Sequence, residues 1–503
     1  MRALSHWELL KLGGAEVILV IAGLLVLLLD LGWMRGEPRR HRMLIAALLS
    51  GVGCLAAALW AWQGGVYGRA LEGVLVVDEG SQLVKLVLLL MALATVGLSV
   101  QSRFTRHVGE YHALLLFGVV GMMLMVSTEN ILMLFVALEI ASLSLYILTA
   151  FNEENPRADE AALKYFLFGG VAAAFLLFGL SLLYGLTGTL DLRLMGSVLA
   201  ERGVDPGVAA ALTLVMVGFG FKVAAVPFHL WAPDAYVGAP TPVAALIGSG
   251  SKVAAFYLLG KVLLAGFHGV AGSAAWRELA SGWALVLAVM ATASLVLGNL
   301  AAIAQGRLKR LLAYSAIGHA GYMLVGTMAL ADPEQARRGF AFVVFYAATY
   351  GLTTIGAFGA AQALEQAGES DSLEAMGGLH RRAPFLSFCL MIFLLSLAGV
   401  PPLVGFAGKF FLFGGALGTG GGFGVVWLVA LAIGMSAVAL YYYLRVLKRV
   451  YVAEAAETAS PLPLPLSVAI VLAVLAALVL ALGLQPGLLV EPLLQAATLP
   501  LGG

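Results

Sequence analysis

The sequence predicts an all-α, polytopic membrane protein of about fourteen transmembrane helices. The first reason is composition, because 61% of the 503 residues are hydrophobic and only 11% are charged, whereas a soluble domain carries about 25% charged residues. The second is that apolar stretches long enough to span a bilayer, about 20 residues each, recur from end to end. The third is that no strand alternation of the β-barrel kind interrupts them, and the helix is the other structure that satisfies its own backbone in lipid.

The expected spans follow one another with short loops between them. We place their centres near residues 24, 52, 91, 118, 140, 174, 220, 252, 292, 319, 350, 400, 433 and 474. No Ser-, Pro- or charge-rich linker longer than a loop divides the chain, so residues 1–503 are expected to form a single membrane domain. The first apolar run is too long for a signal-peptide core and lacks a small-residue cleavage site, which favours a retained first helix.

Two of the expected spans are interrupted, and each interruption lies beside a lysine. A glycine pair and Pro227 break the run that contains Lys222, and Pro401 and Pro402 break the run before Lys409. Matching interrupted segments in two halves indicate inverted repeats around a midplane site. We therefore expect two inverted five-helix repeats, helices 4–8 and helices 9–13, in which helices 7 and 12 are broken. The expected parts are an N-terminal set of three helices (1–105), the first repeat (106–265), the second repeat (276–450) and a C-terminal helix (460–484).

Lysine and arginine residues gather in alternate short loops, which predicts the orientation of the chain. These loops should face the cytoplasm, and both termini should then lie on the periplasmic or outer side of a bacterial inner membrane. The loop FNEENPRADE is acidic although the count places it inside, but acidic residues carry little weight in this rule. The basic loops contain Arg35, Arg39, Arg40 and Arg42; Arg103 and Arg106; Arg307, Lys309 and Arg310; and Arg445, Lys448 and Arg449.

Charge and motif content exclude several other classes of protein. Lys and Arg total 29 against 28 for Asp and Glu, so the chain has no basic excess for nucleic acid and no acidic tail. It contains no G-x-x-x-x-G-K-[ST] loop, no H-E-x-x-H and no cysteine cluster, so we expect no cofactor, no metal and no redox chemistry in this chain. Cys54 and Cys389 lie far apart in apolar runs and are expected to be buried structural thiols.

Five ionisable residues lie deep in the expected spans, where a charge is costly. A charged side chain at the bilayer centre costs from about 2.5 to more than 10 kcal/mol, so such residues are rarely accidental. They are Glu139, Lys222, Lys252, His319 and Lys409. Burial disfavours the charged form of an amine and a nearby carboxylate favours it, so a buried lysine beside a movable carboxylate can load and release a proton. We therefore predict that these five residues form a proton relay in which Glu139 acts on Lys222.

A structural role is the alternative for each of these residues. Lys222, Lys252 and Lys409 could pair or extend towards the interface, Glu139 could serve as a structural partner, and His319 could be a buried histidine bonded to a carbonyl. The coincidence of Lys222 and Lys409 with two helix breaks favours the relay.

Other charged residues are secondary. Lys164 opens an apolar run and could reach inward, and His229 lies in a broken segment that is either a gate or a plug. Lys261, Lys85 and Asp30 lie nearer helix ends, where an interfacial position is expected.

Several long segments of the chain resemble the antiporter-like membrane subunits of respiratory complex I, NADH-quinone oxidoreductase. The resemblance covers nearly the whole chain, and it implies fourteen helices, inverted five-helix repeats and a proton path coupled to quinone reduction elsewhere in the complex. The segments are GEYHALLLFGVVGMMLMVSTENILMLFVALEIASLSLYIL, KYFLFGGVAAAFLLFGLSLLYGLTGTLDL, FKVAAVPFHLWAPDAYVGAPTPVAALIGSGSK, KRLLAYSAIGHAGYMLVG and LSLAGVPPLVGFAGKFFLF.

The resemblance also assigns places to the candidate residues. Glu139 takes the place of the family's glutamate on the fifth helix, and Lys222 that of its partner on the broken seventh. Lys252 takes the place of the connecting lysine on the eighth helix, Lys409 that of the terminal residue on the broken twelfth, and His319 a place where the family often has a polar residue. Other branches have a glutamate at the last place, or a histidine on the eighth helix with a long lateral C-terminal helix. The chain is therefore most similar to the branch called subunit N or subunit 14.

Partners and cofactors outside the chain are implied by the same resemblance. The partners would be the lipid bilayer and other membrane subunits of complex I, including a neighbouring antiporter-like subunit. NADH, FMN, iron-sulfur clusters and quinone would be bound elsewhere in the complex. Two alternatives stay open, a sodium-proton antiporter subunit of the Mrp type and a structural membrane subunit. Sodium dependence would distinguish the first from a proton pump, and neutralisation of Lys222 would distinguish the second.

Overall fold

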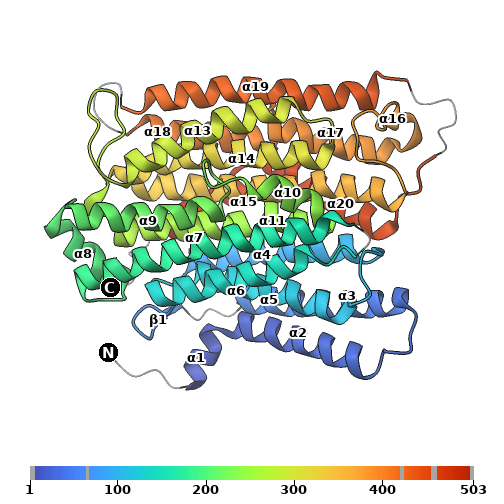
Figure 1. Ribbon diagram of the computed structural model, residues 1–503, viewed down its shortest axis with the longest axis horizontal. Coiled ribbons are helices and arrows are strands. Elements are labelled where there is room, and N and C mark those ends of the chain that lie inside the picture. Colours follow the sequence, from blue (N-terminus) through green and yellow to red (C-terminus); the bar gives the residue numbers. More distant parts are fainter. Residues whose placement is uncertain (1–5, 64–66, 154, 420–423, 455–460, 499–503) are drawn as a thin grey trace.

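The computed structural model describes residues 6–63, 67–153, 155–419, 424–454 and 461–498. In this part of the chain most residues lie in helices that run roughly parallel to one another, as Figure 1 shows. Eleven helical segments of the described chain are long and apolar enough to cross a membrane by length and composition. The prediction of a helical, multi-pass membrane protein is therefore confirmed.

The N-terminal part of the chain contains helices and one short hairpin. The hairpin is antiparallel, with Gly68 opposite Val77 and Ala70 opposite Leu75. These strands were not expected; they are three residues each and lie in the connection between two spans. The elements are α1 (His6–Leu12), α2 (Gly14–Gly32), α3 (Arg39–Gln63), β1 (Gly68–Ala70), β2 (Leu75–Val77) and α4 (Glu79–Ser99).

The next part carries the first pair of candidate residues. Side-chain caps begin some of its helices: Asn130 accepts hydrogen bonds from the backbone amides of Leu132 and Met133 in α6, and Asp205 caps α9, which has Pro206 at its first position. The elements are α5 (Val108–Val126), α6 (Ile131–Thr149), α7 (Arg157–Thr187), α8 (Leu192–Arg202), α9 (Pro206–Lys222), α10 (Trp231–Gly238), α11 (Thr241–Gly248), α12 (Gly250–Lys261), the π-helical turn η1 (Val262–Gly266) and the 3-10 turn η2 (His268–Val270).

The last part carries the remaining candidate residues. The elements are α13 (Trp283–Ile303), α14 (Leu308–Thr327), the 3-10 turn η3 (Met328–Ala331), α15 (Ala336–Gln366), α16 (Leu379–Arg382), α17 (Pro384–Ala398), α18 (Val404–Leu417), α19 (Val426–Tyr451), α20 (Leu466–Leu484) and α21 (Gly487–Thr498). In Figure 1, β1 and α8 lie at the left end of the bundle, whereas α16 and the α2–α3 connection lie at the right end.

Both predicted helix breaks are present. The helix that contains Lys222 ends at that residue, and helix resumes only at Trp231, beyond Pro227. The second break separates α17 from α18 at Pro401 and Pro402. A proline supplies no backbone donor and clashes with the preceding turn, so each break leaves backbone groups that other partners must satisfy.

The interior of the bundle is formed by the segment Thr241–Gly266 and by α15. In the most apolar stretch of each, 100% and 89% of the residues are buried, compared with 28% for α20. The helix α20 therefore lies on the outside of the bundle. Small residues allow the helix backbones to approach closely. A Cβ atom added to Gly298 of α13 would lie 2.5 Å from the backbone nitrogen of Gly318 of α14. Cys54 and Cys389 are free and buried, as predicted.

Candidate functional site

Lys222 ends α9 at the first break, and its side chain is buried. Its Nζ donates a hydrogen bond of 2.8 Å to Oγ of Ser142 on α6. The Ser142 hydroxyl donates its own proton to the backbone oxygen of Leu138, at 2.7 Å. Because a hydroxyl has a single proton, Ser142 presents only lone pairs to Lys222, and the lysine is the donor.

Glu139 lies three residues before Ser142 on α6, so the two side chains share one face of the helix. Glu139 is near enough to Lys222 for an electrostatic interaction. No direct ion pair between them is present in the described residues, because Lys222 contacts the serine instead. The carboxylate oxygen Oε1 of Glu139 is buried and has no hydrogen-bond partner in the same part of the chain. The expected pair is therefore an arrangement of three residues.

Lys252 connects the two halves of the protein. It lies near the start of α12 and is 1% exposed. Its Nζ donates to the backbone oxygen of Ala316 on α14, and it lies 5.8 Å from the centre of the Tyr350 ring on α15. A lysine of the first half thus contacts two helices of the second half.

His319 lies on α14 inside a cage of tyrosines. Its Nδ1 is 2.8 Å from the hydroxyl of Tyr346, and its Nε2 is 3.2 Å from the hydroxyl of Tyr443. The rings of Tyr350 and Tyr322 lie 4.7 and 5.5 Å from the imidazole, measured between ring centres. A neutral imidazole donates from one nitrogen and accepts at the other, so each nitrogen has a phenol hydroxyl with which to exchange a proton.

Lys409 lies on α18, beside the second break. Its Nζ donates to the backbone oxygens of Leu397 and Ala398, at 3.1 and 2.9 Å, and to Oγ of Ser436 at 2.8 Å. It also lies 4.8 Å from the centre of the Tyr322 ring. The two carbonyls end α17, and carbonyls at a helix C-terminus have no partner within their own helix and carry partial negative charge. The break therefore supplies the acceptors that hold this ammonium.

Lys252, His319 and Lys409 form one connected group. His319 interacts electrostatically with both Lys252 and Lys409, and Tyr322 contacts both the imidazole and Lys409. The structure therefore brings these three predicted residues together. It places Glu139 and Lys222 in a separate pair, and no hydrogen bond between Lys222 and Lys252 occurs among the described residues.

The two secondary candidates lie elsewhere. The side chain of Lys164 is 41% exposed and pairs with Glu160 at 2.7 Å and Asp234 at 2.8 Å. The expectation that Lys164 reaches inward is therefore not met. His229 lies between α9 and α10, is 7% exposed, and its Nδ1 has no hydrogen-bond partner in the described part of the chain.

Three charged residues near helix ends, for which an interfacial position was expected, have side chains that pack inside the protein. All three are buried inside the protein, where a charge needs a partner. Each forms an ion pair: Lys85 with Glu16 at 2.8 Å, Asp30 with Arg42 at 2.6 Å, and Lys261 with Glu129 at 3.8 Å.

The hydroxyl groups that contact the candidate residues were not predicted from the sequence. Ser142 could have been found from its spacing, because it lies one helical turn from Glu139. Tyr346 and Tyr350 also lie one turn apart on α15. Tyr443 belongs to a run of three tyrosines on α19, which gives no such signal.

Comparisons with known proteins agree on one family. The family model described as NADH:quinone oxidoreductase/Mrp antiporter, TM, matches residues 128–436. The chain is 50% identical to NADH-quinone oxidoreductase subunit N 2 of Acidobacterium capsulatum, over 98% of this chain and 99% of that protein. It is 38% identical to NADH-quinone oxidoreductase subunit N of Methylovorus glucosotrophus, over 96% of each.

Solved structures are similar as well. A chain of respiratory complex I from Thermus thermophilus has a TM-score of 0.75 at 36% identity, over 95% of this chain and 98% of that chain. A chain of the Mrp complex from a Dietzia species has a TM-score of 0.81 at 22% identity, over 97% of each, and this likeness concerns the fold alone.

Proposed function

Because the chain belongs to the NADH:quinone oxidoreductase/Mrp antiporter membrane family, we propose that it translocates protons as an antiporter-like subunit of an NADH-quinone oxidoreductase, in the manner of subunit N. Quinone reduction elsewhere in the complex supplies the energy. The observation that carries the proposal is the buried group of Lys252, His319 and Lys409, joined by tyrosines across the second half of the chain.

The first step concerns Lys222. Its ammonium donates to Ser142. Glu139 lies one helical turn before Ser142 on α6, and one oxygen of its carboxylate has no partner in the described residues. Movement of this carboxylate towards the ammonium stabilises the loaded lysine, and movement away favours release of the proton.

The second step concerns His319. A proton that reaches one imidazole nitrogen from a tyrosine hydroxyl releases the proton on the other nitrogen to the opposite tyrosine. The ring then returns to its first tautomer by the reverse rearrangement of the hydroxyl hydrogens. Lys252 and Lys409 are the donor and the acceptor on the two sides of this exchange.

The proposed topology has fourteen crossings with inverted repeats. Eleven segments qualify by length and composition, and one crossing each by α9 with α10, by α14, and by α17 with α18 gives fourteen. The basic loops then face the cytoplasm and both termini the outer side. The partners are the other membrane subunits of the complex.

Replacement of Lys222 tests the proposal. In inverted membrane vesicles, Lys222→Ala should abolish NADH-driven proton uptake, while a blot of native gels shows an assembled complex. Full uptake by the assembled variant would overturn the proton role and favour a structural subunit. Uptake that requires sodium would instead support the Mrp-type alternative.

A further inference from the structure

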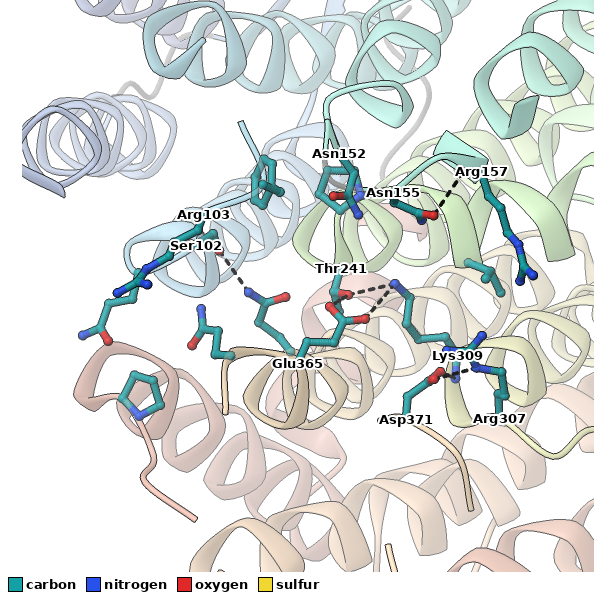
Figure 2. Close-up of a pocket in the computed structure, with 17 residues that line it drawn as sticks. Ser102, Arg103, Asn152, Asn155, Arg157, Thr241, Arg307, Lys309, Glu365 and Asp371 are labelled. Carbon is teal, nitrogen blue, oxygen red and sulfur yellow. Dashed lines mark hydrogen bonds and ion pairs between the residues drawn. The ribbon is translucent and has the colours of Figure 1, made fainter. Parts of the chain in front are cut away.

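A polar cavity of about 780 Å³ opens at the end of the bundle that the basic loops assign to the cytoplasm. Figure 2 shows that its wall is built from both halves of the chain, with Ser102 and Asn152 on one side and Lys309 and Glu365 on the other. None of the five relay residues lines it. The charged side chains that face it are Arg103, Arg157, Arg307, Lys309, Glu365 and Asp371.

Three of the lining residues form a closed triangle. The Nζ of Lys309 is 3.1 Å from Oε1 of Glu365 and 3.0 Å from Oγ1 of Thr241. The Thr241 hydroxyl donates to Oε2 of Glu365 at 2.5 Å. The Glu365 side chain is 37% exposed, whereas that of Lys309 is 5% exposed. The carboxylate therefore meets the cavity, and the ammonium lies behind it.

The triangle lies close to the relay along α14. Lys309 is the second residue of this helix, and the backbone oxygen that accepts from Lys252 belongs to Ala316, seven residues further on. At 1.5 Å per residue the separation along the helix is about 10 Å. A residue that lines the cavity thus lies about two helical turns from the backbone oxygen that accepts from Lys252.

Two buried hydroxyls flank the last residue of α11, the helix that begins with Thr241. The hydroxyls of Tyr236 and Thr354 are buried and have no hydrogen-bond partner in the described residues. A Cβ atom added to Gly248 would lie 3.2 Å from a methyl of Thr354 and 3.5 Å from the Tyr236 hydroxyl, so the two side chains flank one point of α11. Thr354 lies one turn from Tyr350, whose ring faces Lys252. Buried hydroxyls of this kind can pass a proton because each both donates and accepts.

We propose that this cavity is the entrance by which protons reach Lys252, and that the triangle of Lys309, Glu365 and Thr241 is its gate. The proposal rests on the proposed function of the chain. An anionic ligand is disfavoured as the occupant, because the carboxylate of Glu365 would face it and Asp371 already pairs with Arg307 at 2.8 Å.

The gate moves one proton in each cycle. The carboxylate of Glu365 takes a proton from water in the cavity and loses its attraction for the ammonium. Lys309 then gives one proton inward, through the hydroxyls, to the neutral amine of Lys252. The proton held by Glu365 passes to the amine of Lys309, which restores the ammonium and the carboxylate.

Blocking the cavity tests the entrance. The two native cysteines are buried, so Asn152→Cys adds a single reactive thiol in the wall of the cavity. In inverted vesicles, modification of this thiol by a small sulfonate-bearing methanethiosulfonate should remove most NADH-driven proton uptake. The matched control is Arg40→Cys, an exposed position outside the cavity, whose modification should leave uptake unchanged. Full uptake by fully modified Asn152→Cys, with modification measured by mass spectrometry, would overturn the entrance.

Replacement of Glu365, which takes the proton from the cavity, tests the gate. A positioned proton-transfer group contributes roughly 100-fold or more to a rate, so Glu365→Gln should lower coupled turnover at least about tenfold, with a steeper decline towards alkaline pH. Glu369→Gln breaks an ion pair with Arg382 but does not line the cavity, so it should keep the parental rate and pH profile. An unchanged pH profile in Glu365→Gln would refute the gate. If Lys222→Ala stops uptake while both cavity tests are negative, the entrance is wrong and the proposed function stands.

Discussion

Ser142→Ala is the sharpest perturbation of the Lys222 site. The change removes the one hydrogen bond that Lys222 Nζ makes in the described part of the chain. A hydrogen bond to a charged group contributes about 1.5–3 kcal/mol, and about 1.4 kcal/mol corresponds to a factor of ten. The population of Lys222 side chains in the present position should therefore fall by roughly 10- to 100-fold. The ammonium should turn instead to the Glu139 oxygen that has no partner in the described residues, and a direct ion pair would trap it there.

Coupled proton uptake in inverted vesicles measures this effect. We expect the assembled Ser142→Ala complex to show uptake at least about tenfold below that of the parent, by the same arithmetic. Ser142→Thr keeps the hydroxyl and should retain much of the uptake. Ser144→Ala is the matched control, because Ser144 makes the same type of bond to a carbonyl four residues earlier, at 2.8 Å to Ile140, and has no lysine partner among the described residues.

Uptake at the parental level in both Ser142→Ala and Ser144→Ala would refute this reasoning. It would mean that Lys222 is positioned by the shape of the helix break alone. A defect of equal size in both variants would point instead to a general effect of the lost hydroxyl on α6. Only a selective defect at Ser142 supports the arrangement of three residues.

Four further outcomes are expected. His319→Ala removes the group that bonds two tyrosines and should lower coupled uptake by roughly 100-fold or more, without loss of assembly on native gels. Gly298→Ala would place a methyl group 2.5 Å from a backbone nitrogen and should destabilise the helix pair by about 1–3 kcal/mol, seen as less assembled complex on a blot, whereas Gly434→Ala meets nothing within 4 Å and should assemble normally. A cysteine at Pro38 should react with an impermeant thiol reagent only from the cytoplasmic face, and reaction only from outside intact cells would reverse the topology. Glu139→Gln should impair uptake and Glu139→Asp should give an intermediate defect, so full uptake by both variants would show that this charge has no role.

The sequence was sufficient to predict that Lys222, Lys252 and Lys409 are buried and that helices break beside two of them. A charged lysine inside a stretch of about twenty apolar residues costs free energy whichever way its side chain points. Lys222, Lys252 and Lys409 could therefore be recognised without any knowledge of their partners. The breaks could be predicted for a similar reason, since a proline interrupts the backbone ladder whatever surrounds it. Both predictions depend only on the local sequence and on the apolar interior of the bilayer.

The partners of these residues depend on packing and could not be predicted. The hydroxyls around His319 come from α15 and α19, about thirty and more than a hundred residues further along the chain, and in the sequence they are indistinguishable from ordinary core aromatics. The burial of Lys85 was missed because position along a helix gives depth in the bilayer but does not show which neighbour covers the side chain. Eleven long spans were found where fourteen were expected, because both breaks divide a span into short helices and α14 is less apolar than the others.

The two broken helices differ in how firmly they hold their lysines. Lys409 donates to two carbonyls and a hydroxyl and lies against an aromatic ring, whereas Lys222 donates to one hydroxyl. Each hydrogen bond to a charged group contributes about 1.5–3 kcal/mol, so movement of the Lys409 ammonium requires the loss of several such bonds and movement of Lys222 the loss of one. Near the weakly held lysine, Glu139 has an oxygen without a hydrogen-bond partner in the part of the chain that the structure describes. A conformational signal from outside the chain would therefore act most readily at Lys222, and Lys409 would follow only when its carbonyl acceptors at the end of α17 are displaced.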